Sequence, residues 1–552
     1  MNISKIHIEN FKIFKGSFDL TLNKGVNILV GNNESGKSTI IEAIHLALTG
    51  LYNGKYLKNE LNEYLFNNEV VNEYIQSLEQ KNSNATLPHI LIEIYMEGED
   101  LAEFEGNGNT QKSKASGISL KIDFDDRYQN EYAELIKAGG IKTLPIEYYN
   151  ILWSSFARDE NIMPRTIPIK SALIDSASHK LQNGSDIYIS RIIKDILESE
   201  DVVKISQAHR QMKDKFMDDG TIKAINEKIK DTVKISNKKV ELSVELSSKN
   251  AWESSLITCI EDIPFHFIGK GEQCLIKTKL ALGHKKAKEA NIILLEEPEN
   301  HLSHTKLNQL IRDISNENSE KQILISTHNS FVANKLGLEN LIFLNAQKTI
   351  RLNDLSSETF HFFRKLSGYD TLRLLLCDKA ILVEGDSDEL VVQKAFMLKN
   401  DGKLPIEKGI DVISVGTSFL RFLEIAEKIK KQVAVVTDND GDIDALRGKY
   451  ANYLGDHAKD FIKICFDETV DTGTLEINGK NFNYNTLEPK ILKANGRDKV
   501  NSILGTSCEN DDDLHKYMKA NKTECALKIF DMKEDFIFPQ YILDSLSENE
   551  QK

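Results

Sequence analysis

A glycine-rich loop between a buried strand and a helix is the feature that most constrains this chain. Residues 31–39 read G-N-N-E-S-G-K-S-T and fit the pattern G-x-x-x-x-G-K-[ST]. Residues 25–30 before the loop predict a buried strand, and residues 39–48 after it have helical apolar spacing. Backbone N–H groups in such a loop close around phosphates, and the dipole of the following helix favours negative charge. The pattern predicts a nucleoside triphosphate site in an α/β fold.

The loop also assigns roles to individual side chains. We expect Lys37 to reach the β- and γ-phosphates of ATP, and Ser38 to hold the Mg²⁺ that accompanies the nucleotide. The other loop residues expected to contact ATP are Asn32, Asn33, Gly36 and Thr39.

Two later strands supply the other parts of an ATPase site. Residues 292–295 form an apolar run that leads directly into Glu296 and Glu297. Glu296 suits the acid on the magnesium side, and Glu297 suits the base that activates the attacking water. A third strand, residues 323–326, is followed by Thr327 and His328, and we expect His328 to contact the γ-phosphate. Alone, His328 would be an ordinary polar residue, but beside these motifs the functional interpretation is favoured.

These pieces together resemble the RecF/SMC-like branch of the ABC ATPases, whose chains also begin with a strand like residues 6–12, I-H-I-E-N-F-K. That branch carries a signature segment before the acidic strand, and residues 269–273, G-K-G-E-Q, are the candidate. The resemblance implies that Gly271 and Gln273 cap the nucleotide of a second protomer, so that two chains sandwich two ATP molecules. Gly269 stands where the family usually has serine, which argues against fast hydrolysis and not against binding.

A second acidic pattern lies in the last third of the chain. Residues 381–388 read I-L-V-E-G-D-S-D, and residues 433–440 read V-A-V-V-T-D-N-D. Carboxylates after adjacent parallel strands would gather at one sheet edge, where sites form in α/β folds. Such a cluster is unfavourable without a shared cation, and oxygen ligands suit Mg²⁺ or Mn²⁺. The alternative is two ordinary acidic loops.

This second pattern resembles the Toprim fold, with Glu384, Asp388, Asp438 and Asp440 at the matching positions. An ABC ATPase followed by Toprim resembles the OLD (overcoming lysogenisation defect) family of nucleases. That resemblance implies a two-metal site with two late residues, Glu488 as a ligand of the second metal and Lys522 as the cation beside the cleaved phosphate. For these two, a surface charge remains the alternative.

The resemblance implies phosphodiester hydrolysis of DNA in antiphage defence, with ATP binding controlling access. Two rivals remain open: an ATP-gated, non-catalytic DNA clamp or repair scaffold, and a Toprim nuclease directed at RNA. The residues themselves support a dimer. The resemblance further implies a tetramer built from dimers and a helicase-like companion subunit.

The length of 552 residues predicts several domains. We expect an ABC ATPase over residues 1–185 and 241–347, a helical insertion over 186–240, a joint over 348–376 and a Toprim domain over 377–552. In the insertion, an apolar stripe either packs within its own domain or forms a dimer contact. The stripe consists of Ile189, Ile192, Ile193, Ile196 and Leu197.

The location expected from the sequence is the cytoplasm, with no membrane contact. The first residues lack an apolar signal core, and no apolar run approaches the roughly 20 residues that span a bilayer. Six cysteines without any C-x-x-C pair argue for reduced thiols and against a zinc site. The net charge of −14 decides nothing about DNA, since a local basic groove matters more than the sum.

Overall fold

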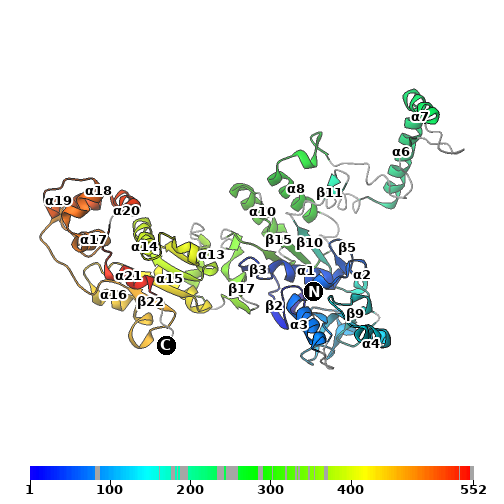
Figure 1. The fold of residues 1–552 in the computed structure, drawn as a ribbon, viewed down its shortest axis with the longest axis horizontal. Helices are drawn as coiled ribbons and strands as arrows, with labels where there is room; N and C mark the ends of the chain where they lie inside the picture. The colour runs from blue at the N-terminus through cyan, green and yellow to red at the C-terminus, as the bar shows by residue number, and fades with distance from the viewer. Residues whose placement is uncertain are drawn as a thin grey trace. The chain divides into compact units, whose positions relative to one another are not determined.

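The structure, a computed structural model, divides into two compact units (Figure 1). Unit 1 comprises Met1–Thr327 and Ala346–Lys348, and unit 2 comprises His328–Asn345 and Thr349–Lys552. The residues described are 1–80, 87–160, 162–175, 181–182, 185–186, 197–232, 242–243, 259–283, 290–300, 302–317, 320–329, 332–333, 336–345, 348–352, 355–365, 371–533 and 535–547. Within these ranges, no helix is long and apolar enough to cross a membrane.

Unit 1 contains an antiparallel sheet and a set of parallel strands. The antiparallel sheet has the order β2-β1-β6-β8-β7, with β9 also paired to β8. Its strands are β1 (Asn2–Glu9), β2 (Ser17–Thr21), β6 (Ile90–Glu97), β7 (Glu105–Gly106), β8 (Ala115–Phe124) and β9 (Tyr149–Ser155). The parallel strands are β10 (Ser171–Asp175), β15 (Ile292–Glu296), β16 (Gln322–Ser326) and β3 (Val26–Gly31), in that spatial order. Parallel strands are covered on both faces, which is why their sequences are nearly continuous apolar runs.

Helix α1 (Lys37–Thr49) lies between these two layers, in contact with β6 and β8 on one side and with β10, β15, β16 and β3 on the other. Its apolar residues therefore face both ways, and Ile40, Ile41 and Ile44 are fully buried. The buried side chain of Gln322 also joins the layers. Its Oε1 accepts from the Ile3 N–H at 2.8 Å, and its Nε2 donates to the Ile3 carbonyl at 2.7 Å. The start of the chain is thereby fixed to the strand set that carries the phosphate loop.

Unit 1 contains further helices among its described residues. They are α2 (Leu57–Glu60), α3 (Asn68–Glu79), α4 (Gln129–Ala138), α6 (Ser199–Asp218), α7 (Gly220–Thr232), α8 (Lys270–Gly283) and α10 (His304–Glu317). Helices α6 and α7 contact each other and fall within the expected helical insertion. Of the expected apolar stripe, Ile189, Ile192, Ile193 and Ile196 lie outside the described residues.

Unit 2 is built on four parallel strands in the order β20-β19-β21-β22. They are β19 (Lys379–Val383), β20 (Ile410–Ser414), β21 (Gln432–Val436) and β22 (Ile462–Cys465). Helices α14 (Asp386–Lys399), α15 (Phe419–Ile429) and α16 (Ile443–Lys449) alternate with the strands. The alternation of strand and helix predicts a parallel α/β sheet, and the structure confirms it. The segment 348–376 holds β18 (Lys348–Arg351), α12 (Ser357–Lys365) and α13 (Thr371–Leu376), and β17 (Leu341–Asn345) precedes it.

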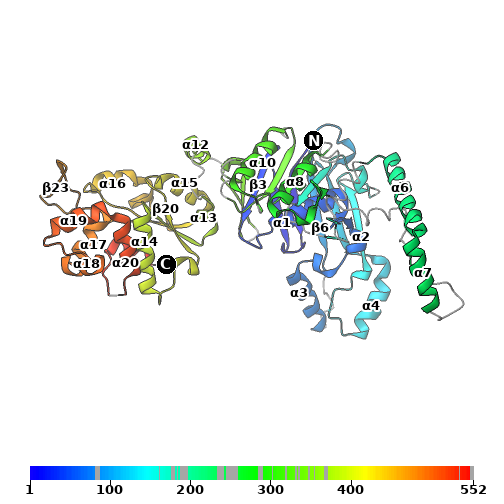
Figure 2. The same ribbon diagram turned by 90° about the horizontal axis from the view of Figure 1, so that it is seen from above.

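The last helices of the chain pack on the same core as the sheet. They are α17 (Leu487–Asn495), α18 (Arg497–Leu504), α19 (Asp511–Ala520), α20 (Lys522–Asp531) and α21 (Gln540–Leu546). Helices α14 and α20 lie side by side (Figures 1 and 2). One buried cluster contains Ile381 of β19, Val392 of α14, Ile491 of α17 and Ile529 of α20. This shared core brings residues near position 490 and residues near position 520 next to the ends of β19 and β21.

Candidate functional site

The phosphate loop of unit 1 is closed around its own lysine. Gly31 ends β3 and Lys37 begins α1, as the sequence predicts. The Lys37 ammonium, on a residue only 5% exposed, donates to the carbonyl oxygens of Gly31 and Asn32, both at 2.9 Å. Gly36 has φ 97°, and a Cβ there would lie 2.6 Å from Phe14 Cζ. Position 36 therefore requires glycine, because any side chain there would strain the backbone and clash with Phe14.

The remaining loop residues are accessible to a ligand. Asn32, Asn33 and Ser38 are exposed, and Thr39 is half-buried. A lysine held at the loop centre with exposed residues around it is suited to exchange its carbonyl partners for phosphate oxygens.

Glutamates converge on this loop from the acidic strand. Glu296 ends β15 in register with Ser326 of β16, and Ser326 is in register with Leu29 of β3. The Glu297 N–H donates to the Ser326 carbonyl at 3.0 Å. Burial lowers the pKa of Lys37, and the charges of Glu297 and Glu299 partly offset that effect. Two carboxylates therefore act on the loop lysine from the neighbouring strand end.

Glu299 is a site residue that the sequence interpretation missed. Its Oε1 accepts from Thr327 Oγ1 at 2.6 Å, which links the end of β15 to the end of β16. The available signal was its place as the last acid of the run E-E-P-E, residues 296–299. His328, the next residue after Thr327, is exposed.

The candidate signature segment forms the start of α8. The Gly269 carbonyl accepts from the N–H groups of Glu272 and Gln273, at 2.9 and 3.0 Å. The Gln273 side chain is buried and donates to the Ile268 carbonyl at 2.8 Å, whereas Gly271 lies in the first turn of the helix. The Gln273 side-chain amide is thus hydrogen-bonded to the backbone just before α8.

The carboxylates of unit 2 leave one edge of its sheet. Strands β19 and β21 are adjacent and parallel, with Leu382 opposite Val435. Glu384 follows β19, and Asp438 and Asp440 follow β21. Asp388 lies in the first turn of α14, where its Oδ2 accepts from the Gly385 N–H at 3.1 Å. The expected convergence of these two acidic loops follows from this strand pairing.

The raised pKa values of Asp438 and Asp388 indicate that the acids share one site. Burial, together with the negative charges of Asp388, Glu384, Glu488 and Asp440, raises the pKa of Asp438 to about 8. Burial also raises the pKa of Asp388 to about 6, with contributions from Glu488 and Glu384. All five acids predicted as metal ligands therefore influence one another.

The two late residues, Glu488 and Lys522, complete this cluster. Glu488, near the start of α17, is 6% exposed, and its Oε1 lies 3.3 Å from Lys522 Nζ at the start of α20. Burial lowers the pKa of Lys522, but the charges of Glu488, Asp438 and Asp388 raise it overall. One cation thus faces an excess of carboxylates, an arrangement that calls for further positive charge.

A buried brace, which the sequence interpretation missed, holds the two acidic elements together. The Asn439 side chain, 2% exposed, donates to the carbonyl oxygens of Asp467 and Thr469. Lys490, two residues after Glu488, lies 2.8 Å from carboxylate oxygens of both Asp467 and Asp471. Residues 467–471 therefore connect the loop of Asp438 to helix α17.

The donor set fits a divalent cation such as Mg²⁺ or Mn²⁺. All five candidate ligands offer carboxylate oxygen, and Glu384 and Asp440 are exposed at the rim of the cluster. Among the described residues, no group of three or more His, Cys, Asp or Glu side chains is closed into a metal-binding shell. The five carboxylates therefore lie in one region, but their oxygen atoms do not surround a common point as metal ligands do.

Comparison with known proteins separates the chain into the same two parts. Residues 2–351 match the family described as RecF/RecN/SMC N terminal domain. Residues 375–440 match the family described as Overcoming lysogenization defect protein-like, TOPRIM domain. The two matched families thus cover consecutive, non-overlapping parts of the chain.

Individual relatives match more narrowly. The Retron Ec83 probable ATPase of Escherichia coli is 46% identical over 52 residues, which cover 9% of this chain and only 10% of that protein. An SmcHead bound to the C-winged helix domain of ScpA has 16% identity and a TM-score of 0.31, covering 63% of this chain and 97% of that one. The SMC head domain from Thermotoga maritima has 14% identity and a TM-score of 0.27, covering 62% and 94%.

Proposed function

Because this chain belongs to the RecF/RecN/SMC N-terminal domain family and carries an OLD-like TOPRIM domain after it, we propose that it is an ATP-binding, metal-dependent DNA endonuclease. The observation that carries this proposal is the convergence of Glu384, Asp388, Asp438, Asp440 and Glu488 at one sheet edge, with Lys522 beside Glu488. A binding module has no need of so unfavourable a cluster, whereas phosphodiester hydrolysis uses both the metal ligands and the cation.

The chain's own residues would divide the work at this site. The five carboxylates would hold two divalent cations, which when bound lower the pKa of water and stabilise the leaving oxygen. Lys522 would offset the charge that develops on the cleaved phosphate. Asn439 and Lys490 would keep the Asp438 loop and α17 at a fixed separation, because both attach to residues 467–471.

ATP would bind in unit 1 and control the nuclease rather than drive its chemistry. Lys37 and Ser38 would take the phosphates and Mg²⁺, with Glu296 on the metal side and Glu297 as the base. Control requires that the ATP-bound and ATP-free states differ in DNA affinity or in site geometry.

Several finer features rest on resemblance to the OLD family, most closely to the nuclease subunit of the Gabija antiphage system. They are a role in antiphage defence in the cytoplasm, a dimer or a tetramer of dimers, and a helicase-like companion subunit. We place the domain limits as in the sequence interpretation, with Toprim over 377–552.

Cleavage of supercoiled and linear DNA with Mg²⁺ or Mn²⁺ tests the proposal. We expect the wild type to cut in the presence of metal, and Asp438→Ala to lose at least about a hundredfold of that activity. Lys37→Ala, measured with and without ATP, reports whether the nucleotide restrains or enables cleavage. Equal cleavage by the wild type and Asp438→Ala would show that the activity lies elsewhere.

Two other outcomes would point to the rival functions. Cleavage of RNA with intact DNA would identify an RNA-directed nuclease. ATP binding and DNA binding without cleavage of either substrate would identify an ATP-gated clamp.

A further inference from the structure

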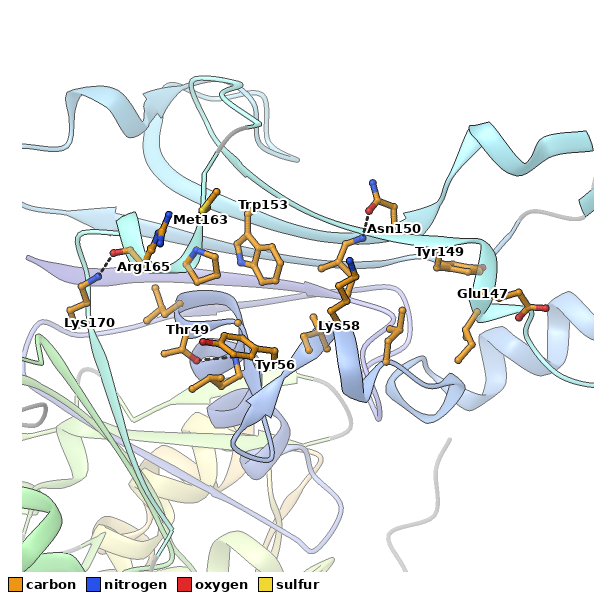
Figure 3. Close-up of a pocket in the computed structure, with 18 residues that line it drawn as sticks. Thr49, Tyr56, Lys58, Glu147, Tyr149, Asn150, Trp153, Met163, Arg165 and Lys170 are labelled. Carbon is orange, nitrogen blue, oxygen red and sulfur yellow. Dashed lines mark hydrogen bonds between the residues drawn. The ribbon is translucent and has the colours of Figure 1, made fainter. Parts of the chain in front are cut away.

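A cavity of about 1040 Å³ lies in unit 1 at the far end of α1 from the phosphate loop (Figure 3). Its walls come from the end of α1, the turn into α2, strand β9 and residues 163–170. Because α1 has 13 residues, the cavity is separated from the phosphate loop by about 20 Å of helix. The volume is at the upper end of the range in which proteins bind small ligands.

The wall formed by Trp153 is fixed before any ligand arrives. Its indole N–H donates to the Ala47 carbonyl of α1 at 3.0 Å. Gly50, in the left-handed conformation that ends α1, packs so closely that a Cβ would lie 2.9 Å from Pro164 and 3.6 Å from Trp153. A pocket with rigid walls loses little conformational entropy when it binds.

Aromatic rings face the cavity from two sides. Figure 3 shows Trp153 on the β9 side and Tyr56 on the opposite side, next to α2. Tyr56 is 71% exposed, so its ring has an open face and is not part of the core. Two rings on opposite walls suit a flat aromatic ligand, because stacking on such side chains is favourable for every nucleobase.

The charges around the cavity select an anion. The lining contains three basic side chains, Lys58, Arg165 and Lys170, against one acidic side chain, Glu147. Over the described part of the chain, Lys58, Arg165 and Lys170 form no ion pair with a carboxylate, and Lys170 Nζ donates to the Arg165 carbonyl at 2.9 Å. A local excess of unpaired cations in a chain of net charge −14 favours phosphate or a similar anion.

We propose that this cavity is a second nucleotide-binding site, distinct from the phosphate loop. It takes a nucleobase between Trp153 and Tyr56 and the attached phosphates on the basic side chains of the lining, which Figure 3 shows on both sides of Trp153, with Lys58 on one side and Arg165 on the other. The same chemistry is offered by a free nucleotide and by one nucleotide of a single-stranded nucleic acid. The proposal does not depend on nuclease activity, since the cavity uses none of the carboxylates of unit 2.

Tryptophan fluorescence of the full chain tests this site directly. The chain has two tryptophans, so Trp252→Phe leaves Trp153 as the sole reporter. We expect saturable quenching when AMP, dAMP or an oligo-deoxythymidine strand stacks on Trp153. Quenching by mononucleotides would identify a free nucleotide as the ligand, and quenching by the strand alone would identify a nucleic acid.

Variants decide whether the quenching arises in the cavity. Tyr56→Ala should weaken binding about tenfold, as loss of one stacking partner does, and Lys58→Glu should weaken it at least as much. Tyr64→Ala, which removes another exposed tyrosine outside the cavity lining, should leave the affinity unchanged. Lys37→Ala should also leave it unchanged. Absence of saturable quenching, equal affinity in Tyr56→Ala, or loss in Lys37→Ala would overturn the proposal.

Discussion

Asp438 illustrates how a single residue links the stability of this protein to its proposed chemistry. Burial and four neighbouring carboxylates raise its pKa from the ordinary value of 3.8 to about 8. A buried carboxyl group among other carboxylates destabilises the fold, and strongly shifted pKa values of this kind are typical of functional sites. The same holds in milder form for Asp388, whose pKa is raised to about 6.

The pH dependence of stability follows from this shift. In the folded, metal-free protein Asp438 keeps a proton that the unfolded chain releases above its ordinary pKa, so stability should fall as pH rises from about 4 to about 8. Asp438→Asn removes that loss, and its melting temperature in EDTA at pH 8 should exceed the wild-type value by about 2–4 °C. Thermal unfolding between pH 5 and pH 8 measures the effect.

The matched control for that measurement is Asp444→Asn, which removes an exposed carboxylate in the first turn of α16. It should retain the wild-type pH dependence. Parallel curves for the wild type and Asp438→Asn would mean that Asp438 does not hold a proton in the folded state.

Site residues in both units could be predicted from the sequence where they belong to a short contiguous motif. Lys37 and Glu297 lie in contiguous motifs, and the structure brings Glu297 close enough to act on Lys37. Asn439 and Lys490 could not be predicted, because their partners at residues 467–471 lie 19 to 30 positions away and no short motif marks the pairing.

At the scale of elements, the strands were the most predictable part of the chain. The apolar runs at residues 292–295 and 323–325 form most of β15 and β16, since strands buried on both faces are nearly continuous apolar runs. The antiparallel sheet was less legible, because β8 and β9 each mix polar and apolar residues and pair over long separations. The packing of the last helices on α14 could not be predicted, because no pattern within any single segment of the sequence indicates it.

The brace between the Asp438 loop and α17 gives a prediction at this scale. Lys490 is 3% exposed and pairs with Asp467 and Asp471, so Lys490→Met leaves Asp467 without its cation and Asp471 with Lys493 alone. Since both acids are partly solvated, we expect the free energy of unfolding to fall by about 2–3 kcal/mol. Urea denaturation followed by circular dichroism measures it.

Lys493→Met is the natural comparison, because Lys493 also pairs with Asp471 but is 60% exposed. Its cost should stay below about 1 kcal/mol. Equal losses in the two variants would show that the brace contributes no more than a surface ion pair.

At the scale of the whole molecule, the resemblance to the RecF/SMC-like ATPases predicts that ATP joins two chains. Glu297→Gln should bind ATP while hydrolysing it slowly, and sedimentation velocity should then show the mass of a dimer only when ATP is present. Lys37→Ala should remain unchanged by ATP. A Glu297→Gln protein whose mass is the same with and without ATP would contradict nucleotide-dependent association.

The most direct test of the proposed metal site in unit 2 is uptake of Mn²⁺ by the nucleotide-free protein, measured by the loss of the free-ion electron paramagnetic resonance signal. We predict saturable binding of up to two ions per chain to the wild type and to Asp444→Asn, and at least about tenfold weaker binding to Asp438→Asn and Glu488→Gln. Indistinguishable Mn²⁺ isotherms for the wild type and both site variants would mean that these carboxylates are not a metal site.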